Sequence, residues 1–443
     1  MNPPLRIAMF VGSFPVVSET FIVRQIAGLL DLGHDVDIYA DTRGEADSPI
    51  QPEVTKYRLL ERTTFMKMPP ETAPWEMPVW PVTGRTWPPG ATGSIHNSIR
   101  VLRALSRLFQ CLTTAPRLTF QALNPGEYRY QAASLSALYR LAALSRIRKR
   151  YDVLHAHFGP VGNSFRFARD LWRAPLIVSF HGYDFCTAPR QEGSDMYHGL
   201  FATADTITVN SEYTRKRVSQ LGCPSTRLHK IPVGLDPAVF TFHERHRKPE
   251  EPVRILVVGR LVAIKGHEYC IRAVAKLRDR HPGVRLEIVG DGPLRKTLEE
   301  LAAKLDLQQI VTFSGACDGV TLNRLMAESH LFVLPSVSIE GDQEGQGLVL
   351  QEAQACGLPV IATDSGGLPE GILPGQTGFL VPERDADALA ERLAYFIEHP
   401  EILPIMGRKG RDWVEECYDI GKLNRQLVEL YARTIADYRT RNE

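Results

Sequence analysis

The sequence predicts an α/β protein made of two doubly wound, Rossmann-like domains that face a central cleft. Its 443 residues exceed what one ordinary hydrophobic core organises, so two domains are expected. In each half, short strands that are apolar on both faces alternate with helices, as in a parallel sheet covered on both sides. A polar, proline-containing stretch near residues 236–252 separates the halves. In such folds the ligand binds at the carboxyl ends of the strands.

The first half, residues 1–240, opens with a strand, a helix and a strand at the length of a parallel crossover unit. A helix is expected over residues 20–30. The expected strands are Ile7–Val11, Val36–Tyr39, Val153–His157, Leu176–Phe180 and Thr206–Val209. Residues 69–90 interrupt the pattern with seven prolines and three tryptophans, which indicates an irregular surface loop.

The second half, residues 241–415, alternates more regularly. The expected strands are Arg254–Val258, Arg285–Val289, Val311–Ser314, Leu331–Leu334 and Val360–Thr363. Helices are expected over residues 265–280, 294–305, 321–328, 348–355 and 386–396. A final helical segment, residues 416–443, is expected to pack back on the first domain.

The composition excludes several classes of protein. An apolar content of 44% and a charged content of 23% are those of a soluble globular chain. A formal net charge of +1 argues against nucleic-acid binding driven by bulk charge. The seven cysteines are scattered and never spaced as C-x-x-C, which favours reduced thiols in the cytoplasm. The N-terminal stretch is interpreted as a first strand rather than a signal peptide, and no run of about 18 apolar residues is present, so a cytoplasmic location is expected.

A cationic motif, "VVGRLVAIKG", follows the first strand of the second half. Gly259 permits a close turn, Arg260 leaves the end of the strand, and Lys265 opens the next helix. Two cations near a helix N-terminus form a good site for a diphosphate, although both could equally be solvated surface residues. No G-x-G-x-x-G is present in this segment, so a dehydrogenase-type dinucleotide site has little support.

A second anion-binding segment is "ATDSGGLPEGI". It leaves the strand at residues 360–363 and turns through Gly366 and Gly367. Backbone N–H groups at glycines can reach phosphate oxygens, so both glycines are candidates for binding the diphosphate. Alone, the segment is also compatible with an ordinary strand-to-helix turn.

Two carboxylates, Glu344 and Glu352, lie in the stretch "EGQGLVLQEA", which precedes the second anion-binding segment. Glu344 lies on a loop where Gly345 and Gly347 let the backbone approach a ligand, and Glu352 follows on a helix. Carboxylates accept hydrogen bonds from the vicinal hydroxyls of a sugar or a ribose. Singly, Glu344 could be a solvated loop acid and Glu352 a buried acid paired with a cation. Together with Arg260 and Lys265, they indicate a nucleotide-sugar as ligand.

The longer stretch "EGQGLVLQEAQACGLPVIATDSGGLPE" resembles the signature of group 1 glycosyltransferases, the retaining, nucleotide-sugar-dependent enzymes of GT-B fold. The resemblance implies that Glu352 holds the ribose, Glu344 contacts the donor sugar, and Arg260 and Lys265 bind the diphosphate. It also implies that the first domain binds the acceptor and the second the donor. Gln346 stands where many members of the family carry an aromatic or aliphatic residue.

In the first half, the same resemblance assigns His181 of "VSFHGYDF" to a place near the transferred sugar. A purely structural histidine is the alternative. Gly12 is the one glycine in the turn "VGSFPVVSETF" and is a candidate contact to the diphosphate. The stretch "FPVVSETFI" is similar to bacterial exopolysaccharide transferases of the colanic acid type.

No metal or cofactor is expected. Asp35-Val36-Asp37 matches the D-x-D metal motif of the other glycosyltransferase fold, but it begins a strand of a parallel-sheet pattern. Arg260 and Lys265 could stabilise a leaving diphosphate without a metal. The resemblance implies transfer with retention through a same-face displacement, in which the leaving phosphate helps to deprotonate the acceptor.

The expected function is therefore transfer of a sugar from a UDP- or GDP-sugar to a glycan or a polyprenyl-diphosphate-linked saccharide in cell-surface polysaccharide synthesis. Two alternatives remain open at this point. One is a nucleotide-sugar 2-epimerase of the same architecture. The other is a non-catalytic scaffold, which the presence of Arg260, Lys265, Glu344 and Glu352 disfavours.

Residues 100–150 carry ten basic side chains and one acid, in a chain of net charge +1. The pattern predicts two amphipathic helices, the second ending in "RIRKR" with Arg146, Arg148 and Arg150. This segment could rest on anionic lipid at the inner face of the cytoplasmic membrane, where each basic residue contributes roughly 1 kcal/mol. An ordinary pair of domain helices with a solvated basic face is the alternative.

Overall fold

The computed structural model describes residues 3–44, 51–66, 97–248 and 250–442. Side chains are described for these residues except Val17 and residues 97–101. The loop predicted at residues 69–90 lies outside the described residues. None of the described helices is both long and apolar enough to cross a bilayer.

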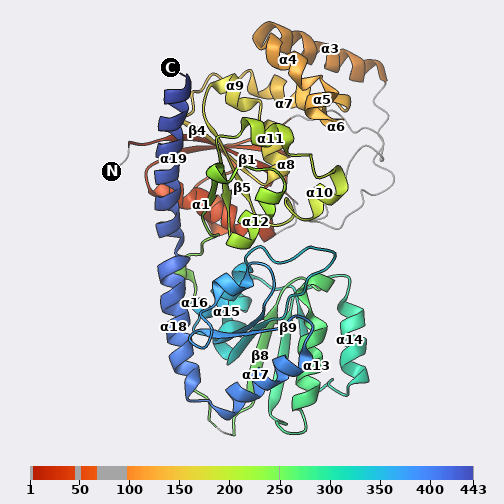
Figure 1. Ribbon diagram of the computed structural model, residues 1–443, viewed down its shortest axis with the longest axis vertical. Coiled ribbons are helices and arrows are strands. Elements are labelled where there is room, and N and C mark those ends of the chain that lie inside the picture. The colour runs from red at the N-terminus through yellow and green to blue at the C-terminus, as the bar shows by residue number, and fades with distance from the viewer. Residues whose placement is uncertain (1–2, 45–50, 67–96, 249, 443) are drawn as a thin grey trace.

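The N-terminal domain contains a seven-stranded parallel sheet in the order β3-β2-β1-β4-β5-β6-β7 (Figure 1). Its strands are β1 (Arg6–Phe14), β2 (Asp35–Arg43), β3 (Thr63–Phe65), β4 (Val153–His157), β5 (Leu176–Phe180), β6 (Thr206–Val209) and β7 (Leu228–Lys230). The helices around this sheet are α1 (Thr20–Asp31), α2 (Pro52–Lys56), α8 (Gly159–Phe165), α9 (Ala168–Trp172), α10 (Thr187–Glu192), α11 (His198–Thr203) and α12 (Glu212–Gln220).

The C-terminal domain contains a six-stranded parallel sheet in the order β10-β9-β8-β11-β12-β13. Its strands are β8 (Val253–Val258), β9 (Val284–Val289), β10 (Val311–Gly315), β11 (Leu331–Leu334), β12 (Val360–Thr363) and β13 (Gly378–Val381). Its helices are α13 (His267–Leu277), α14 (Arg295–Lys304), α15 (Gly319–Glu328), α16 (Leu348–Ala355), α17 (Ala386–Glu398) and α18 (Ile402–Cys417).

Each sheet separates two hydrophobic cores, because alternate residues of a strand face opposite sides. In β1, Ile7 and Met9 enter one core while Ala8 and Phe10 enter the other. In β11, Leu331 and Val333 likewise lie opposite Phe332 and Leu334. The prediction of two Rossmann-like, doubly wound domains is therefore confirmed. In both sheets the strand order reverses beside the first strand, where such folds bind ligands.

The basic segment differs from its prediction. It folds into five helices, α3 (Asn97–Thr114), α4 (Pro116–Ala122), α5 (Pro125–Tyr128), α6 (Tyr130–Ala133) and α7 (Ser136–Leu144). The predicted second amphipathic helix is wrong: α7 is buried over almost its whole length and ends before "RIRKR". Arg140 lies in this buried helix because its guanidinium pairs with both carboxylate oxygens of Asp41, each at 2.8 Å.

The chain crosses between the domains twice, and the two crossings lie side by side. Leu235 N–H donates to the Tyr418 carbonyl at 2.9 Å, and Ile420 N–H donates to the Leu235 carbonyl at 2.8 Å. The expected linker also contains Arg245, a buried residue that donates to the carbonyls of Ala327 and Cys356. The polar stretch near 236–252 is thus partly packed on the C-terminal domain.

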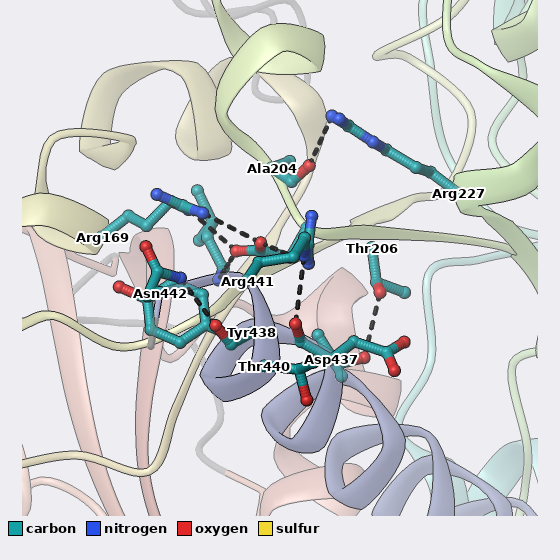
Figure 2. A network of polar contacts seen from close by, with 12 residues as sticks. Arg169, Ala204, Thr206, Arg227, Asp437, Tyr438, Thr440, Arg441 and Asn442 are labelled. Carbon is teal, nitrogen blue, oxygen red and sulfur yellow. Dashed lines mark hydrogen bonds and ion pairs between the residues drawn. The ribbon is translucent and has the colours of Figure 1, made fainter.

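The final helix, α19 (Ile420–Asn442), runs back along the N-terminal domain (Figure 1). Leu427, Tyr431 and Ile435 enter the core formed by β1, β2 and α1. Figure 2 shows the polar contacts at its C-terminal end, where Arg441 reaches Asp205 at 3.0 Å. Arg169 also binds Asp205, at 2.9 and 3.1 Å, and stacks its guanidinium over Tyr438. The last segment of the chain therefore forms part of the N-terminal domain.

Candidate functional site

A cleft of about 690 Å³ lies between the two domains. Its C-terminal wall contains Arg260 and Lys265, which follow β8, and the loop and helix from Asp342 to Glu352. Its N-terminal wall contains His181 after β5, Asn210 after β6, and the segment that begins α1. The structure brings together eight of the residues singled out in the sequence, namely His181, Arg260, Lys265, Glu344, Gly345, Gln346, Gly347 and Glu352.

Glu344 and Lys265 form an ion pair inside this cleft. The Glu344 side chain is 13% exposed and the Lys265 side chain 17%, so neither is a freely solvated surface group. The same carboxylate oxygen accepts a hydrogen bond from the Ser336 hydroxyl at 3.2 Å. Without a ligand, the cation assigned to the diphosphate and the carboxylate assigned to the sugar thus neutralise each other.

Arg260 is exposed, and among the described residues its guanidinium has no ion pair. Its backbone is held in place because His267, at the start of α13, contacts the Arg260 carbonyl through Nε2 at 3.1 Å. Within the described residues, Arg260 is therefore a cation without a charged partner on the cleft wall, and Lys265 lies on the same wall in its pair with Glu344. An anionic ligand could therefore meet two positive charges on this side.

Glu352 lies on the second turn of α16, where it is half-buried, and its carboxylate has neither a hydrogen bond nor an ion pair in the described part of the chain. Burial raises the pKa of its carboxyl group, and the nearby charge of Arg24 from α1 partly offsets that rise. A partly buried carboxylate on a cleft wall accepts hydrogen bonds from a ligand that supplies donors. Hydroxyl groups of a bound ribose would do so.

The loop before α16 depends on its glycines. Gly347 caps α16 with a φ of 74°, a left-handed conformation that favours glycine. A Cβ on Gly345 would lie 2.5 Å from the His181 carbonyl oxygen, so this glycine permits the two domains to touch. The donor-sugar loop predicted at residues 345–347 is therefore a contact between domains as well as a wall of the cleft.

Gln346 makes two of these interdomain contacts. Its Oε1 accepts from the Val233 N–H at 2.7 Å, and its Nε2 donates to the Val233 carbonyl at 2.8 Å. The residue that departs from the family pattern thus clasps the backbone of the opposite domain. We call this pair of bonds the Gln346 clasp.

Gly366 and Gly367 do not line the cleft as predicted. They pack against the backbone of the donor-sugar loop. A Cβ on Gly366 would lie 2.2 Å from the Glu344 carbonyl oxygen, and one on Gly367 would lie 2.0 Å from that of Gly345. The Gly367 N–H, expected to face phosphate, donates to the Glu344 carbonyl at 2.8 Å. Their glycine character is explained by this close backbone packing.

Gly12 is also displaced from its predicted role. The first strand continues to Phe14, so Gly12 lies within β1, between residues that pair with Ala40 and Thr42. Ser18, Thr20 and Phe21 line the cleft in its place. These three residues were not predicted, because the first strand runs on to Phe14, beyond its predicted end at Val11.

His181 follows β5 on a turn organised by Asp184. The buried Asp184 carboxylate accepts the N–H groups of His181, Gly182 and Gly159 at 2.8 to 3.2 Å. Burial raises the pKa of Asp184 to about 6 despite these donors. Burial and the neighbouring His155 lower the pKa of His181 to about 3, so its ring is neutral near pH 7.

A second interdomain cluster, which the sequence did not indicate, lies beside the donor loop. Arg190 of α10 pairs with Asp342 and, at 3.3 Å, with Glu340. Thr187 donates to Asp342 at 3.0 Å. Asp342 and Glu340 belong to the same acidic, glycine-rich stretch as Glu344. The carboxylates of Asp342 and Glu340 therefore connect the C-terminal domain to the N-terminal domain.

Asp35 and Asp37 lie at the amino end of β2. Asp35 pairs with Arg62 at 2.9 Å, and Asp37 pairs with Lys149 at 2.7 Å. Among the described residues, no group of three histidine, cysteine or acidic side chains is arranged to hold a metal. Both acids are therefore paired with cations at the amino end of β2, which is the end away from the cleft.

Two family models match the chain. Residues 18–234 match the glycosyl transferase 4-like domain, and residues 239–413 match glycosyl transferases group 1. A GDP-mannose-dependent phosphatidylinositol monomannoside mannosyltransferase of Mycolicibacterium smegmatis is 32% identical over 308 residues, which are 65% of this chain and 78% of that protein. The chain is a group 1 glycosyltransferase.

Two further similarities extend over nearly the whole glycosyltransferase. WcaL of Escherichia coli K12, a glycosyltransferase assigned to colanic acid biosynthesis, is 29% identical over 436 residues, covering 96% of this chain and 99% of WcaL. The crystal structure of Anabaena HepE with UDP and glucose superposes with a TM-score of 0.67 at 18% identity, covering 97% of this chain and 100% of HepE. The structural likeness shows the GT-B fold, as expected from the sequence.

Proposed function

We propose that this glycosyltransferase moves a sugar, with retention of configuration, from a nucleotide-diphosphate-sugar to a saccharide acceptor in bacterial exopolysaccharide synthesis. The observation that carries the proposal is the cleft itself, where Arg260 and Lys265 lie on the same wall as Glu344 and the unpartnered Glu352. Cations suit a diphosphate, and carboxylates suit the hydroxyls at either side of it. The assignment of WcaL to colanic acid biosynthesis supports the class of product.

In this proposal the diphosphate replaces Glu344 as the partner of Lys265. That exchange frees the Glu344 carboxylate to accept hydroxyl groups of the donor sugar, while Glu352 accepts those of the ribose. Arg260 and Lys265 then stabilise the negative charge that grows on the diphosphate as the glycosidic bond breaks. The released phosphate oxygen takes the proton of the acceptor hydroxyl on the same face of the sugar.

We propose that the donor is a UDP-sugar or a GDP-sugar. Anabaena HepE binds UDP and glucose, and the related mannosyltransferase depends on GDP-mannose. A thermal-shift screen with UDP, GDP and their sugars should separate the two possibilities. The cognate nucleotide should raise the melting temperature, because a ligand that binds only the folded state stabilises it.

The decisive test is transfer itself. The purified protein is incubated with the donor selected by the screen, with and without a bacterial lipid extract, and the products are separated. Incorporation of sugar into extracted glycolipid supports the proposal. Release of a free epimerised sugar without acceptor would instead favour the 2-epimerase alternative, and no turnover with any donor would favour a scaffold.

We also propose that the acceptor is reached at a membrane surface. The exposed apolar side chains of α3 and α4 are Leu102, Leu105, Phe109, Leu112 and Phe120, which we call the α3–α4 surface. Arg103 and Arg117 lie exposed on the same helices, and Arg146, Arg148 and Arg150 are exposed after α7. Apolar side chains together with cations are what an anionic bilayer binds. In Figure 1 these helices lie at the end of the molecule remote from the C-terminal domain.

Flotation with anionic vesicles tests the membrane proposal. Wild-type protein should float with the vesicles at low salt and separate at high salt. Changing Leu105 and Phe109 to serine should weaken binding, as should changing Arg146, Arg148 and Arg150 to glutamate. Changing Arg280, Arg324 and Arg392 to glutamate makes the same change in net charge on the exposed surface of the C-terminal domain, and it should leave flotation unchanged. Wild-type protein that stays free of anionic vesicles would overturn the proposal.

A further inference from the structure

Three histidine rings lie in a stack beside the cleft, of which His155 and His157 are buried and His181 is partly exposed. His155 and His157 come from β4, where a spacing of two residues places both on the same face of the sheet. Their ring centroids are 4.7 Å apart, and those of His157 and His181 are 5.3 Å apart with an interplanar angle of 14°. The sequence analysis singled out only His181. The stack therefore connects a proposed site residue to the interior of the N-terminal domain.

His157 and His181 share one hydrogen bond, between His157 Nδ1 and His181 Nε2 at 3.0 Å. One of these nitrogens must carry a proton and the other a lone pair. The remaining nitrogens, His157 Nε2 and His181 Nδ1, are buried without a partner. A neutral imidazole carries one N–H, so the tautomer of one ring dictates that of the other.

The environment keeps both rings neutral. Burial lowers the pKa of His157 well below its ordinary value, and the neighbouring His155 and His181 lower it further. The same causes, burial and His155, lower the pKa of His181. With both rings uncharged, the hydrogen bond between them has only two proton arrangements.

His155 at the other end of the stack has both nitrogens bonded. Its Nδ1 lies 2.6 Å from the Tyr431 hydroxyl of α19, and its Nε2 lies 2.7 Å from the Ser179 hydroxyl. Ser179 in turn lies 2.5 Å from the Thr208 hydroxyl on β6. These contacts fix the ring against which His157 stacks, and they join it to the final helix of the chain.

His181 also separates two hollows. It lines the interdomain cleft and a small interior cavity of about 30 Å³, whose other polar lining residues include His157, Gln25 and Asn210. A cavity of this size can hold about one water molecule. The ring is therefore reached from the cleft on one side and supported by polar groups on the other.

We propose that His157 is a positioning residue for sugar transfer: by donating its Nδ1–H to His181 Nε2, it holds the His181 ring in place with its proton on Nδ1. This inference rests on the proposed function. In either proton arrangement one buried N–H is left over. We assign it to His181 Nδ1, because His181 lines both the cleft and the small cavity, whereas His157 lines only the cavity.

The first test measures whether the two histidines act as a unit. His157→Leu should lower kcat about 10- to 100-fold, the usual loss when the partner that orients a functional histidine is removed. The dissociation constant of the nucleotide should be unchanged. His157→Asn, whose side-chain amide can still donate, should retain most of the activity. In the His181→Ala background, His157→Leu should cause little further loss.

His34→Leu is the matched control. His34 is also buried in the N-terminal domain with one hydrogen bond, which it accepts from the Leu5 N–H at 3.1 Å, but it lies at the amino end of the strands. This variant should leave kcat unchanged after correction for the folded fraction. Losses from His157→Leu and His181→Ala that multiply in the double variant would show independent roles and overturn the proposal.

The second test needs no transferase activity. Nitrogen-15 spectra of histidine-labelled protein distinguish the two neutral tautomers. His181 should carry its proton on Nδ1 in the wild type and shift toward the Nε2–H form, which free imidazole side chains favour, in His157→Leu. A wild-type His181 protonated on Nε2 would overturn the proposal. If no donor is turned over, the proposed function fails while this measurement still decides the role of His157.

Discussion

The two domains have the same strand order around their first strands, yet they present different chemistry to the cleft. The C-terminal wall carries charges: Arg260, Lys265, Glu344 and Glu352. The N-terminal wall carries hydroxyl, aromatic and imidazole groups, with Ser18, Thr20, Phe21 and His181 among them. The comparison shows that one scaffold can supply an anion-binding face and a largely uncharged face, depending on which residues follow its strands.

The connections between equivalent strands differ as well. In the C-terminal domain, β10 and β11 are joined through the single helix α15. In the N-terminal domain, the described part of the connection between β3 and β4 contains α3 to α7. That addition lies on the domain proposed to bind the acceptor (Figure 1). In that proposal, the chain enlarges the common scaffold on the acceptor side and not on the donor side.

The largest effect is expected at Glu344, the acid nearest the sugar in our proposal. Glu344→Gln keeps the shape of the side chain and removes its charge, so transfer should fall on the order of 10²- to 10³-fold, as when one charge-stabilising group leaves an active site. Nucleotide affinity should not fall, because the variant removes the carboxylate that competes with the diphosphate for Lys265. Initial rates and a binding titration measure the two quantities separately.

Glu340→Gln is the control for this change. Glu340 lies on the same acidic loop, but its side chain is 84% exposed and its partner is Arg190. It should transfer sugar at nearly the wild-type rate. If Glu344→Gln transfers sugar at the wild-type rate, the Glu344 carboxylate does not contact the donor sugar during transfer.

Arg260→Ala tests the charged wall at the diphosphate. The side chain has no partner to leave unpaired among the described residues, so its loss should leave the melting temperature unchanged. Turnover should fall on the order of 10²-fold, because a cation that stabilises the leaving group is missing in the transition state.

Chelation of divalent ions should not alter the wild-type rate. A rate of transfer that falls sharply with chelator and recovers with manganese would contradict the proposal that Arg260 and Lys265 stabilise the diphosphate without a metal.

Glu352→Ala should act on binding. We expect the nucleotide dissociation constant to rise by the equivalent of about 1–3 kcal/mol, the value of hydrogen bonds to a charged acceptor. Isothermal titration with the cognate nucleoside diphosphate measures it. Free phosphate or diphosphate should bind the variant as they bind the wild type, because neither contains a ribose. An equal loss for all three ligands would place Glu352 at the phosphates.

The central strands of both sheets were predictable, for a physical reason. The strands β4, β5 and β6 of the N-terminal domain and β11 and β12 of the C-terminal domain agree residue for residue with their predictions, and Arg260, Lys265, Glu344 and Glu352 all line the cleft. Buried parallel strands and residues just after them are set by local sequence. Short edge strands such as β3 and β7 were missed because three residues carry little periodicity.

Roles that depend on distant segments could not be read locally. Gly366 and Gly367 gave the expected signal of an anion site, but they are occupied by the backbone of residues 344 and 345. His155 and His157 looked like ordinary strand residues until β5 and α19 supplied their partners. In both cases the deciding neighbour lies elsewhere in the sequence.

The Gln346 clasp offers the smallest effect and the most direct test of how the two walls meet. Gln346→Leu has similar volume and removes both bonds to Val233, leaving a buried N–H and a carbonyl without partners. At about 0.5–1.5 kcal/mol for each bond, the domains should separate more readily and kcat/KM should fall about tenfold. Small-angle scattering of the ligand-free protein should show a larger radius of gyration.

Gln343→Leu is the control, because the Gln343 side chain binds Ser338 and Glu383 within its own domain. This variant should leave the radius of gyration unchanged. If Gln346→Leu scatters as the wild type does, the other interdomain contacts hold the walls together, and the clasp only orders the donor-sugar loop. Those contacts are Arg190 with Asp342 and Glu340, and Glu370 with Lys230 and the N-terminus of α12.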